Sequence, residues 1–141
     1  MSFGAAAERR QNRPAEASAC PCGAGETFGE CCGPLLDGAP APTAEALMRS
    51  RYTAFVLRDA PYLAATWHPS TRPADLALDD DTRWRRLEIV RTDAGGPTRG
   101  TVEFRAHWDD PSGTRGILHE VSRFVFQRGR WLYLDGEVEA F

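Results

Sequence analysis

The 141-residue sequence predicts an α+β fold, with helices packed on one face of a curved antiparallel sheet, behind a small cysteine motif. Apolar residues recur at helical spacing from residue 43 to about 67, and they alternate with polar residues from residue 87 onward. All four cysteines lie within 13 positions near the start of the chain. Helices followed by consecutive strands with short turns favour an antiparallel α+β domain over a parallel α/β fold.

Three zones divide the chain. Residues 1–18 are rich in Ala and Arg, with Gly and Pro, and are expected to form a disordered tail. Residues 19–38, the cysteine motif, hold every cysteine and five glycines. Residues 43–141 carry the apolar pattern of the folded domain, after a short linker with two prolines at 37–42.

The helical part begins with Thr43, which is a good N-cap residue for a first helix. Asp59 can cap a second helix, which should end before His68-Pro69, because a residue that precedes proline avoids the helical region. A short third helix is predicted over residues 73–78.

Strands are predicted from residue 87 to the turn at 94–97, and at 102–108, 115–127 and 131–134, after which Asp135-Gly136 should turn the chain away. In the third strand Glu120 shares a face with Ser122 and Phe124, whereas His119 points to the opposite face. His119 and Glu120 therefore cannot both enter one cavity unless a bulge intervenes. A curved sheet over a layer of helices would leave a conical pocket between them.

The bulk composition limits the class of protein. The formal net charge of −3 argues against a protein that coats nucleic acid, because that affinity comes mainly from neutralised phosphates. No run approaches the roughly 20 apolar residues of a membrane helix. The first 18 residues hold no secretory signal. A cytoplasmic protein without membrane contact is therefore expected.

Cys20, Cys22, Cys31 and Cys32 are the expected ligands of one structural zinc ion. Zinc takes four thiolates in tetrahedral geometry, and the glycines between the two cysteine pairs allow the chain to return to the ion. A site closed by four thiolates leaves no open position for catalysis. A reducing compartment favours metal over disulfides. Free thiols in a loose segment, or two disulfides in an oxidised sample, are the alternatives.

The cysteine motif also resembles a known one. The string from Cys20 to Gly25, followed by Cys31-Cys32-Gly33, is similar to the SEC-C zinc motif at the C-terminal tail of the SecA translocase. Further strings resemble the YchJ family over residues 19–136, among them LMRSRY at 47–52, TWHPSTR at 66–72 and GRW at 129–131. The resemblance implies a nuclear-transport-factor-2-like cone behind the zinc motif. It implies no particular activity and no catalytic residue.

The conical pocket should have aromatic walls and a few polar groups. Glu120 is a candidate general base, because a carboxylate on an apolar strand face must find a partner or change its pKa. The alternative is an ion pair with Arg51 or Arg72. His68 is either a residue that stabilises a helix end or a second candidate base. The candidate pocket residues are Tyr52, Trp67, His68, Arg72, Glu120, Trp131 and Asp135.

Three functions remain open. The leading hypothesis is a binding or adaptor protein, in which the zinc motif contacts a protein partner and the cone holds a small-molecule ligand or a dimer contact. The second is a small-molecule enzyme of isomerase or dehydratase type that uses Glu120 or His68. The third is nucleic-acid binding through the motif and the arginines, against which the net charge argues. No catalytic constellation stands out, and this favours binding over catalysis.

Overall fold

The computed structural model of the chain describes residues 13–78 and 81–139. Within the cysteine motif lie a short 3-10 turn, η1 (Phe28–Glu30), and helix α2 (Cys32–Leu36). The domain adds helices α3 (Ala44–Leu57) and α4 (Ala60–Ala65). Four strands follow, which are β1 (Arg83–Ala94), β2 (Arg99–Asp109), β3 (Arg115–Gln127) and β4 (Arg130–Val138).

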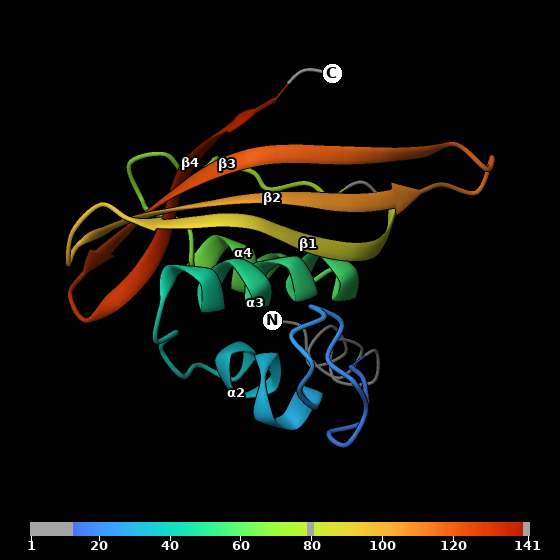
Figure 1. The fold of residues 1–141 in the computed structure, drawn as a ribbon, viewed down its shortest axis with the longest axis horizontal. Helices are drawn as coiled ribbons and strands as arrows, with labels where there is room; N and C mark the ends of the chain where they lie inside the picture. The colour runs from blue at the N-terminus through green and yellow to red at the C-terminus, as the bar shows by residue number, and fades with distance from the viewer. Residues whose placement is uncertain (1–12, 79–80, 140–141) are drawn as a thin grey trace.

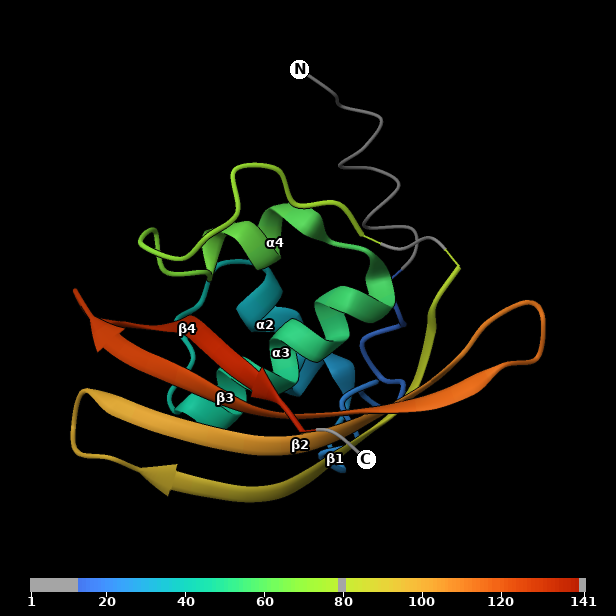
Figure 2. The same ribbon diagram turned by 90° about the horizontal axis from the view of Figure 1, so that it is seen from above.

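The elements form three layers (Figure 1). The strands pair in the order β1-β2-β3-β4, and every pair is antiparallel. Helix α3 lies against one face of this sheet with α4 packed beside it, and α2 with the cysteine motif lies on the far side of α3. Seen from above, the sheet curves around the helices (Figure 2). The predicted α+β architecture is confirmed.

Helix α3 begins where the sequence predicts, because the Thr43 hydroxyl accepts a hydrogen bond of 3.0 Å from the backbone N–H of Ala46. It ends at Arg58, whose backbone is left-handed with φ of 58°. Buried residues occur all around this helix, including polar Ser50 and Thr53, both 0% exposed. A helix buried on every side must be covered from two directions. The sheet covers one side of α3 and the cysteine motif covers the other.

Helix α4 is capped by the Asp59 side chain, which accepts from the N–H of Tyr62, and it ends at Ala65, ahead of His68-Pro69 as predicted. Trp67 then forms a bridge with Tyr133 of β4. The predicted helix at 73–78 is wrong, since these residues have no helical structure. Leu76 and Leu78 are half-buried on either side of exposed Ala77, a period of two that suits extended chain.

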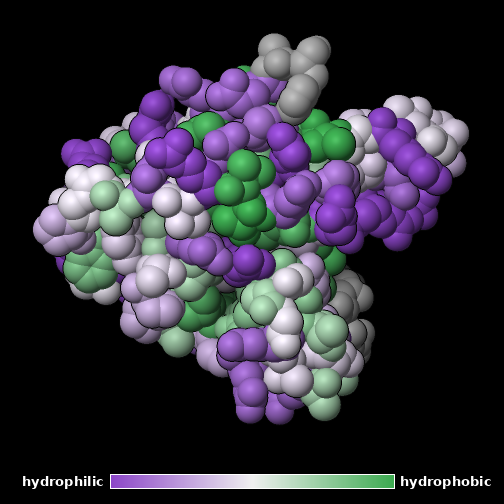
Figure 3. Space-filling view, viewed as in Figure 1, coloured by the Kyte–Doolittle hydropathy of each residue, from purple (hydrophilic) through white to green (hydrophobic). Residues whose placement is uncertain are grey.

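The inner face of the sheet forms the floor of the domain core, with Val102, Phe104, Ala106, Ser122 and Phe124 at most 4% exposed. The register of β2 and β3 is continuous from Arg99–Val125 to Asp109–Arg115. The outward residues of the edge strand β1 are largely arginines, which protect a free strand edge. Hydrophilic side chains accordingly dominate the sheet region of the face in Figure 3, around one hydrophobic area near its centre.

Strand β4 runs further than predicted. Asp135 and Gly136 were expected in a terminal turn, but they lie inside the strand and pair with Arg123 and Ser122 of β3. The register shifts between Arg123 and Phe124, because Leu134 is an extra residue on β4. The strand therefore passes through a β-bulge and continues beyond its hydrophobic residues.

Residues 1–12 of the expected tail lie outside the described part of the chain. The next few residues contact the cysteine motif, where Ser18 accepts from the N–H of Phe28 at 2.8 Å and Glu16 accepts from the N–H of Gly29 at 2.9 Å. None of the helices in the described ranges is long and apolar enough to cross a membrane.

Candidate metal centre and cone cavity

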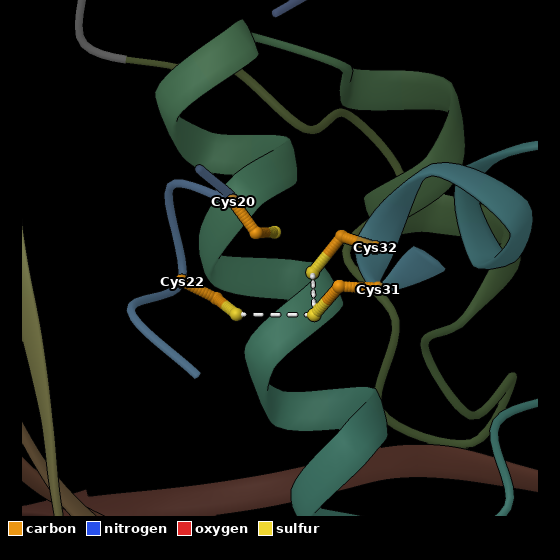
Figure 4. Close-up of side chains that lie close together, drawn as sticks. All are labelled: Cys20, Cys22, Cys31 and Cys32. Carbon is orange, nitrogen blue, oxygen red and sulfur yellow. Dashed lines mark hydrogen bonds between the residues drawn. The ribbon is translucent and has the colours of Figure 1, made fainter. Parts of the chain in front are cut away.

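The four cysteine side chains converge on one point in front of α3 (Figure 4). Cys20 and Cys22 come from a loop that turns at Gly23, which has a left-handed backbone with φ of 76°. Cys31 and Cys32 lie where η1 passes into α2. All four sulfur atoms are within 4.8 Å of one another.

This spacing suits a tetrahedral metal and no disulfide. Four sulfurs placed about 2.3 Å from a central zinc ion would stand roughly 3.8 Å apart. The Cys22 and Cys31 sulfurs are 3.5 Å apart, and those of Cys31 and Cys32 are 4.0 Å apart. A disulfide would need about 2.05 Å, and all four cysteines are free. The cluster is therefore compatible with metal binding as predicted.

The electrostatics of the thiols point the same way. A hydrogen bond from Cys32 lowers the pKa of Cys22 to about 5, against the effect of burial. Burial raises the pKa of Cys31 to about 12, and the hydrogen bond to Cys22, followed by burial, raises that of Cys32. Without a cation the protein favours the thiolate of Cys22 and disfavours those of Cys31 and Cys32. A bound cation would offset the repulsion among four thiolates.

Helix α3 supports the cysteine motif through two side chains one turn apart. The hydroxyl of Thr53 donates to the sulfur of Cys32 at 3.4 Å, and Thr53 is fully buried. Arg49 donates from Nη1 to the backbone carbonyl of Cys22 at 2.9 Å. Residues four apart share a helix face, so both contacts come from the side of α3 that turns away from the sheet. Side chains that hydrogen-bond to the metal-binding residues without touching the metal hold the sulfur ligands in position.

A cavity of about 210 Å³ lies between α3 and the inner face of the sheet. Its walls are mostly aromatic and come from Tyr52, Phe55, Trp67, Trp84 and Phe104. Four polar side chains gather at the cavity, which are those of Arg51, Glu120, Ser122 and Tyr133. This cavity lies between the helices and the sheet, where the sequence predicts a pocket.

Arg51 is 3% exposed, and burial lowers its pKa to about 10. Its Nη1 atom donates to the carbonyl of Leu63 at 2.8 Å and to the hydroxyl of Thr66 at 2.7 Å. The guanidinium also lies over two rings, 5.1 Å from the centre of Trp67 and 4.6 Å from that of Tyr133. Among the described residues, its Nε and Nη2 atoms make no hydrogen bond and no carboxylate pairs with it.

Glu120, one of the candidate pocket residues, lines the cavity. Its Oε2 atom accepts from the hydroxyls of Ser122 at 2.5 Å and of Tyr133 at 3.3 Å. Burial, followed by the charge of Glu120, raises the pKa of Tyr133 and keeps this phenol a donor. Neither Arg51 nor Arg72 forms an ion pair with Glu120 in the part of the chain that the structure describes. The alternative of a salt-bridged Glu120 is therefore wrong.

The other predicted pocket residues divide into two groups. Tyr52 and Trp67 line the cavity together with Glu120. Four lie elsewhere, and each has another contact. His68 bonds Gln127 and Ser70, Arg72 donates to the carbonyl of Ala64, Asp135 pairs with Arg123, and Trp131 packs on Phe126 beside a separate groove of about 430 Å³.

The bulge at Leu134 explains the position of Asp135. Side chains alternate along a strand, so Tyr133 and Asp135 should share a face. The extra residue reverses the alternation, which puts Tyr133 and Gly136 inward and Asp135 outward. Sequence reasoning missed Arg51, Ser122 and Tyr133 as polar members of the cavity. The signal for Ser122 was present, because it shares a strand face with Glu120 and Phe124.

The fold and the cysteine cluster together define a class, in which a four-cysteine metal motif precedes a curved sheet packed on helices. Residues 43–136 match the family described as "YchJ, middle NTF2-like domain", and residues 18–34 match the SEC-C motif. The chain belongs to the YchJ family of SEC-C motif proteins.

Relatives and solved structures agree with this assignment. A UPF0225 protein of Streptomyces coelicolor is 55% identical over 121 residues, which cover 84% of this chain and 94% of the relative. A UPF0225 protein of Ralstonia nicotianae is 49% identical over 138 residues, covering 89% and 94%. The solution structure of a SEC-C motif containing protein from Rhodopseudomonas palustris matches with a TM-score of 0.77 and 36% identity, covering 86% of this chain and 98% of that one. A crystal structure of such a protein from Psychrobacter arcticus matches with a TM-score of 0.72 and 30% identity, covering 89% and 85%.

Proposed function

We propose that the metal is zinc, that it is structural, and that the protein acts by binding a small molecule in the cone rather than by catalysis. Four thiolates at tetrahedral spacing are a typical structural zinc set, with no ligand position left for a water or a substrate. Thiolates of this kind persist in a reducing compartment, so we place the protein in the cytoplasm.

This proposal rests on the observation that α3 contacts both the cysteine motif and the cavity. One face of the helix holds the cysteine motif through Arg49 and Thr53, and another face lines the cavity through Arg51 and Tyr52. The metal centre thus fixes the helix that forms one wall of the cavity. A folded metal motif would keep the cavity in its binding shape.

Binding is favoured over catalysis by the surroundings of Glu120. Within the described residues no histidine lines the cavity beside it, and its carboxylate is already bonded by two hydroxyls. His119, its neighbour in sequence, lies on the other face of the sheet and bonds Glu103 at 2.6 Å. Within the described residues the cavity lining offers Glu120 neither a histidine nor a second carboxylate as a partner in acid–base catalysis. A protein partner at the cysteine motif remains a prediction.

The test is NMR of the protein with and without zinc. The Nε1 atom of Trp67 is buried at the cavity and makes no hydrogen bond among the described residues, so its indole N–H signal reports on the cavity. Removing zinc with a chelator should broaden or shift this signal, and zinc, but not magnesium, should restore it. Trp108 lines a separate groove that contains no residue of the cysteine motif, and it provides a control signal. An identical Trp67 signal in metal-free and zinc-loaded protein would contradict the proposal.

A further inference from the structure

Among the described residues no anion directly contacts the buried guanidinium of Arg51, although the charge of nearby Glu120 attracts it. Taking a cation out of water costs several kcal/mol unless it is paired, and here Nη1 alone is bonded, to two neutral oxygens. Nε and Nη2 form the edge of the guanidinium that binds a carboxylate through two parallel hydrogen bonds. That edge makes no hydrogen bond within residues 13–78 and 81–139, and Arg51 lines the cavity.

The size of the cavity limits what can supply the anion. A cavity of about 150 Å³ accepts a benzene ring, whereas drug-sized ligands occupy roughly 300–1,000 Å³. At about 210 Å³ this cavity fits a single ring with small substituents. The walls formed by Phe55, Trp84 and Phe104 favour a flat aromatic ring, since aromatic pairs gain from edge-to-face contact.

Glu120 supplies a second polar contact. Its Oε2 atom is bonded to Ser122 and Tyr133, while Oε1 makes no hydrogen bond among the described residues. Tyr133 stands between the two charged groups, with Arg51 over its ring and Glu120 at its hydroxyl. The cavity therefore offers donors at one point and an acceptor at another. A ligand that uses both must carry an acceptor group and a separate donor.

We propose that the cone binds a single-ring aromatic carboxylic acid that carries a hydroxyl group, of the hydroxybenzoate class. The carboxylate takes the Nε and Nη2 edge of Arg51, the ring packs between the aromatic walls, and the hydroxyl donates to Glu120. This assignment rests on the proposed role of the cone as a ligand site and specifies the ligand's chemistry.

The experiment is calorimetric titration of the zinc-loaded protein with benzoate, 3-hydroxybenzoate, 4-hydroxybenzoate and benzamide, with NMR to locate the binding. A hydroxybenzoate should bind at least about tenfold more tightly than benzamide, which keeps the shape but lacks the charge. At least one hydroxybenzoate should bind more tightly than benzoate. Binding should shift the indole N–H signal of Trp67 and leave that of Trp131 in place.

Three variants separate recognition from folding. Arg51→Lys keeps the charge but loses the planar edge, and should weaken hydroxybenzoate binding at least about tenfold. Glu120→Gln removes the like charge, and should strengthen benzoate binding by about threefold or more while abolishing the preference for the hydroxyl. Arg86→Met on the exposed sheet surface is the matched control, and should bind as the unaltered protein does. Each variant's amide spectrum reports whether it folds.

These experiments distinguish failure of the acid assignment from failure of the proposed function. If benzamide and the acids bind equally, or if Arg51→Lys binds hydroxybenzoate unchanged, the acid assignment is wrong and the cone remains a ligand site. If none of the four compounds shifts the Trp67 signal, the acid assignment is also wrong. The proposed function is then judged separately, by whether the Trp67 signal depends on zinc. Tight acid binding that shifts Trp67 and is lost in Arg51→Lys supports the proposal.

Discussion

Replacing Arg51 by Met should remove the anion site at small cost to the folded state. The lowered pKa of Arg51, about 10 against an ordinary 12.5, corresponds to about 3 kcal/mol by which burial of the charge, partly offset by the charges of Tyr133, Tyr62 and Glu120, opposes folding. On the favourable side are two hydrogen bonds, worth about 1 kcal/mol each, and contacts with the rings of Trp67 and Tyr133, worth about 1 kcal/mol each. Met fills similar space without a charge. The terms cancel to within about 2 kcal/mol.

The bonding partners left behind change this balance only slightly. The Thr66 hydroxyl still donates to the carbonyl of Tyr62 at 2.8 Å, so it is not left unsatisfied. The Leu63 carbonyl loses its donor but is still approached by the Thr66 hydroxyl at 3.4 Å, so its cost should lie near the lower end of the roughly 1–3 kcal/mol of an unsatisfied buried group. A buried cation with a true ion-pair partner behaves differently, because breaking such a pair costs about 3–5 kcal/mol. Near-neutral stability together with lost binding would therefore mark Arg51 as a binding residue.

Urea unfolding of the zinc-saturated proteins measures this directly. The midpoint for Arg51→Met should correspond to a free energy of unfolding within about 2 kcal/mol of the unaltered protein, with an unchanged slope. Arg123→Met removes exposed ion pairs to Asp135 and Glu137, and serves as a control whose unfolding midpoint should stay close to that of the unaltered protein. A loss of more than about 3 kcal/mol for Arg51→Met would refute the reasoning and make Arg51 a structural residue.

Three further changes test other parts of the structure. Thr53→Val removes the hydroxyl that donates to Cys32 and keeps the shape, so zinc affinity, measured by competition with a chelator, should fall about 10–100-fold; an unchanged affinity would show that the bond does not support the metal. Gly116→Ala should cost about 1–3 kcal/mol in chemical unfolding, because the added carbon would lie 2.4 Å from the Trp108 ring. Gly95→Ala, whose added carbon meets only Arg99 at 3.4 Å, should be nearly neutral, and equal effects of the two would contradict this packing. Burial raises the pKa of Tyr52 from 10 to about 12, so its neutral form stabilises the fold fully below pH 10, and this contribution is lost as the pH rises to about 12. Between pH 9 and 12 the free energy of unfolding of Tyr52→Phe should therefore fall by about 1–2 kcal/mol less than that of the unaltered protein. If the free energies of the two proteins fall in parallel with pH, the assignment to Tyr52 is refuted.

The sequence predicts most of the metal centre and half of the cavity, for identifiable reasons. The four cysteines are close in sequence, so their convergence needs only a local turn. The inward position of Glu120 and Ser122 follows from the period of two in β3, whose register with β2 is unbroken. The local alternation of polar and apolar residues is therefore sufficient to assign side chains to a face wherever a strand is regular.

The misses come from long-range packing. A single extra residue at Leu134 reverses the faces of β4, which moves Asp135 outward, and no residue type marks that site as a bulge. Arg51 lies in a helix that is buried from two sides only because the cysteine motif packs behind it. Its lack of an ion-pair partner among the described residues depends on the tertiary structure and has no sequence signature.

Mass spectrometry of the intact protein under non-denaturing, reducing conditions tests the central claim most directly, which is that Cys20, Cys22, Cys31 and Cys32 together hold one zinc ion. Protein purified without added metal should carry a single zinc per chain, and the Cys32→Ser variant should lose it to a chelator that leaves the unaltered protein loaded. A chain that carries no stoichiometric metal, or one whose zinc is indifferent to Cys32→Ser, would contradict the account.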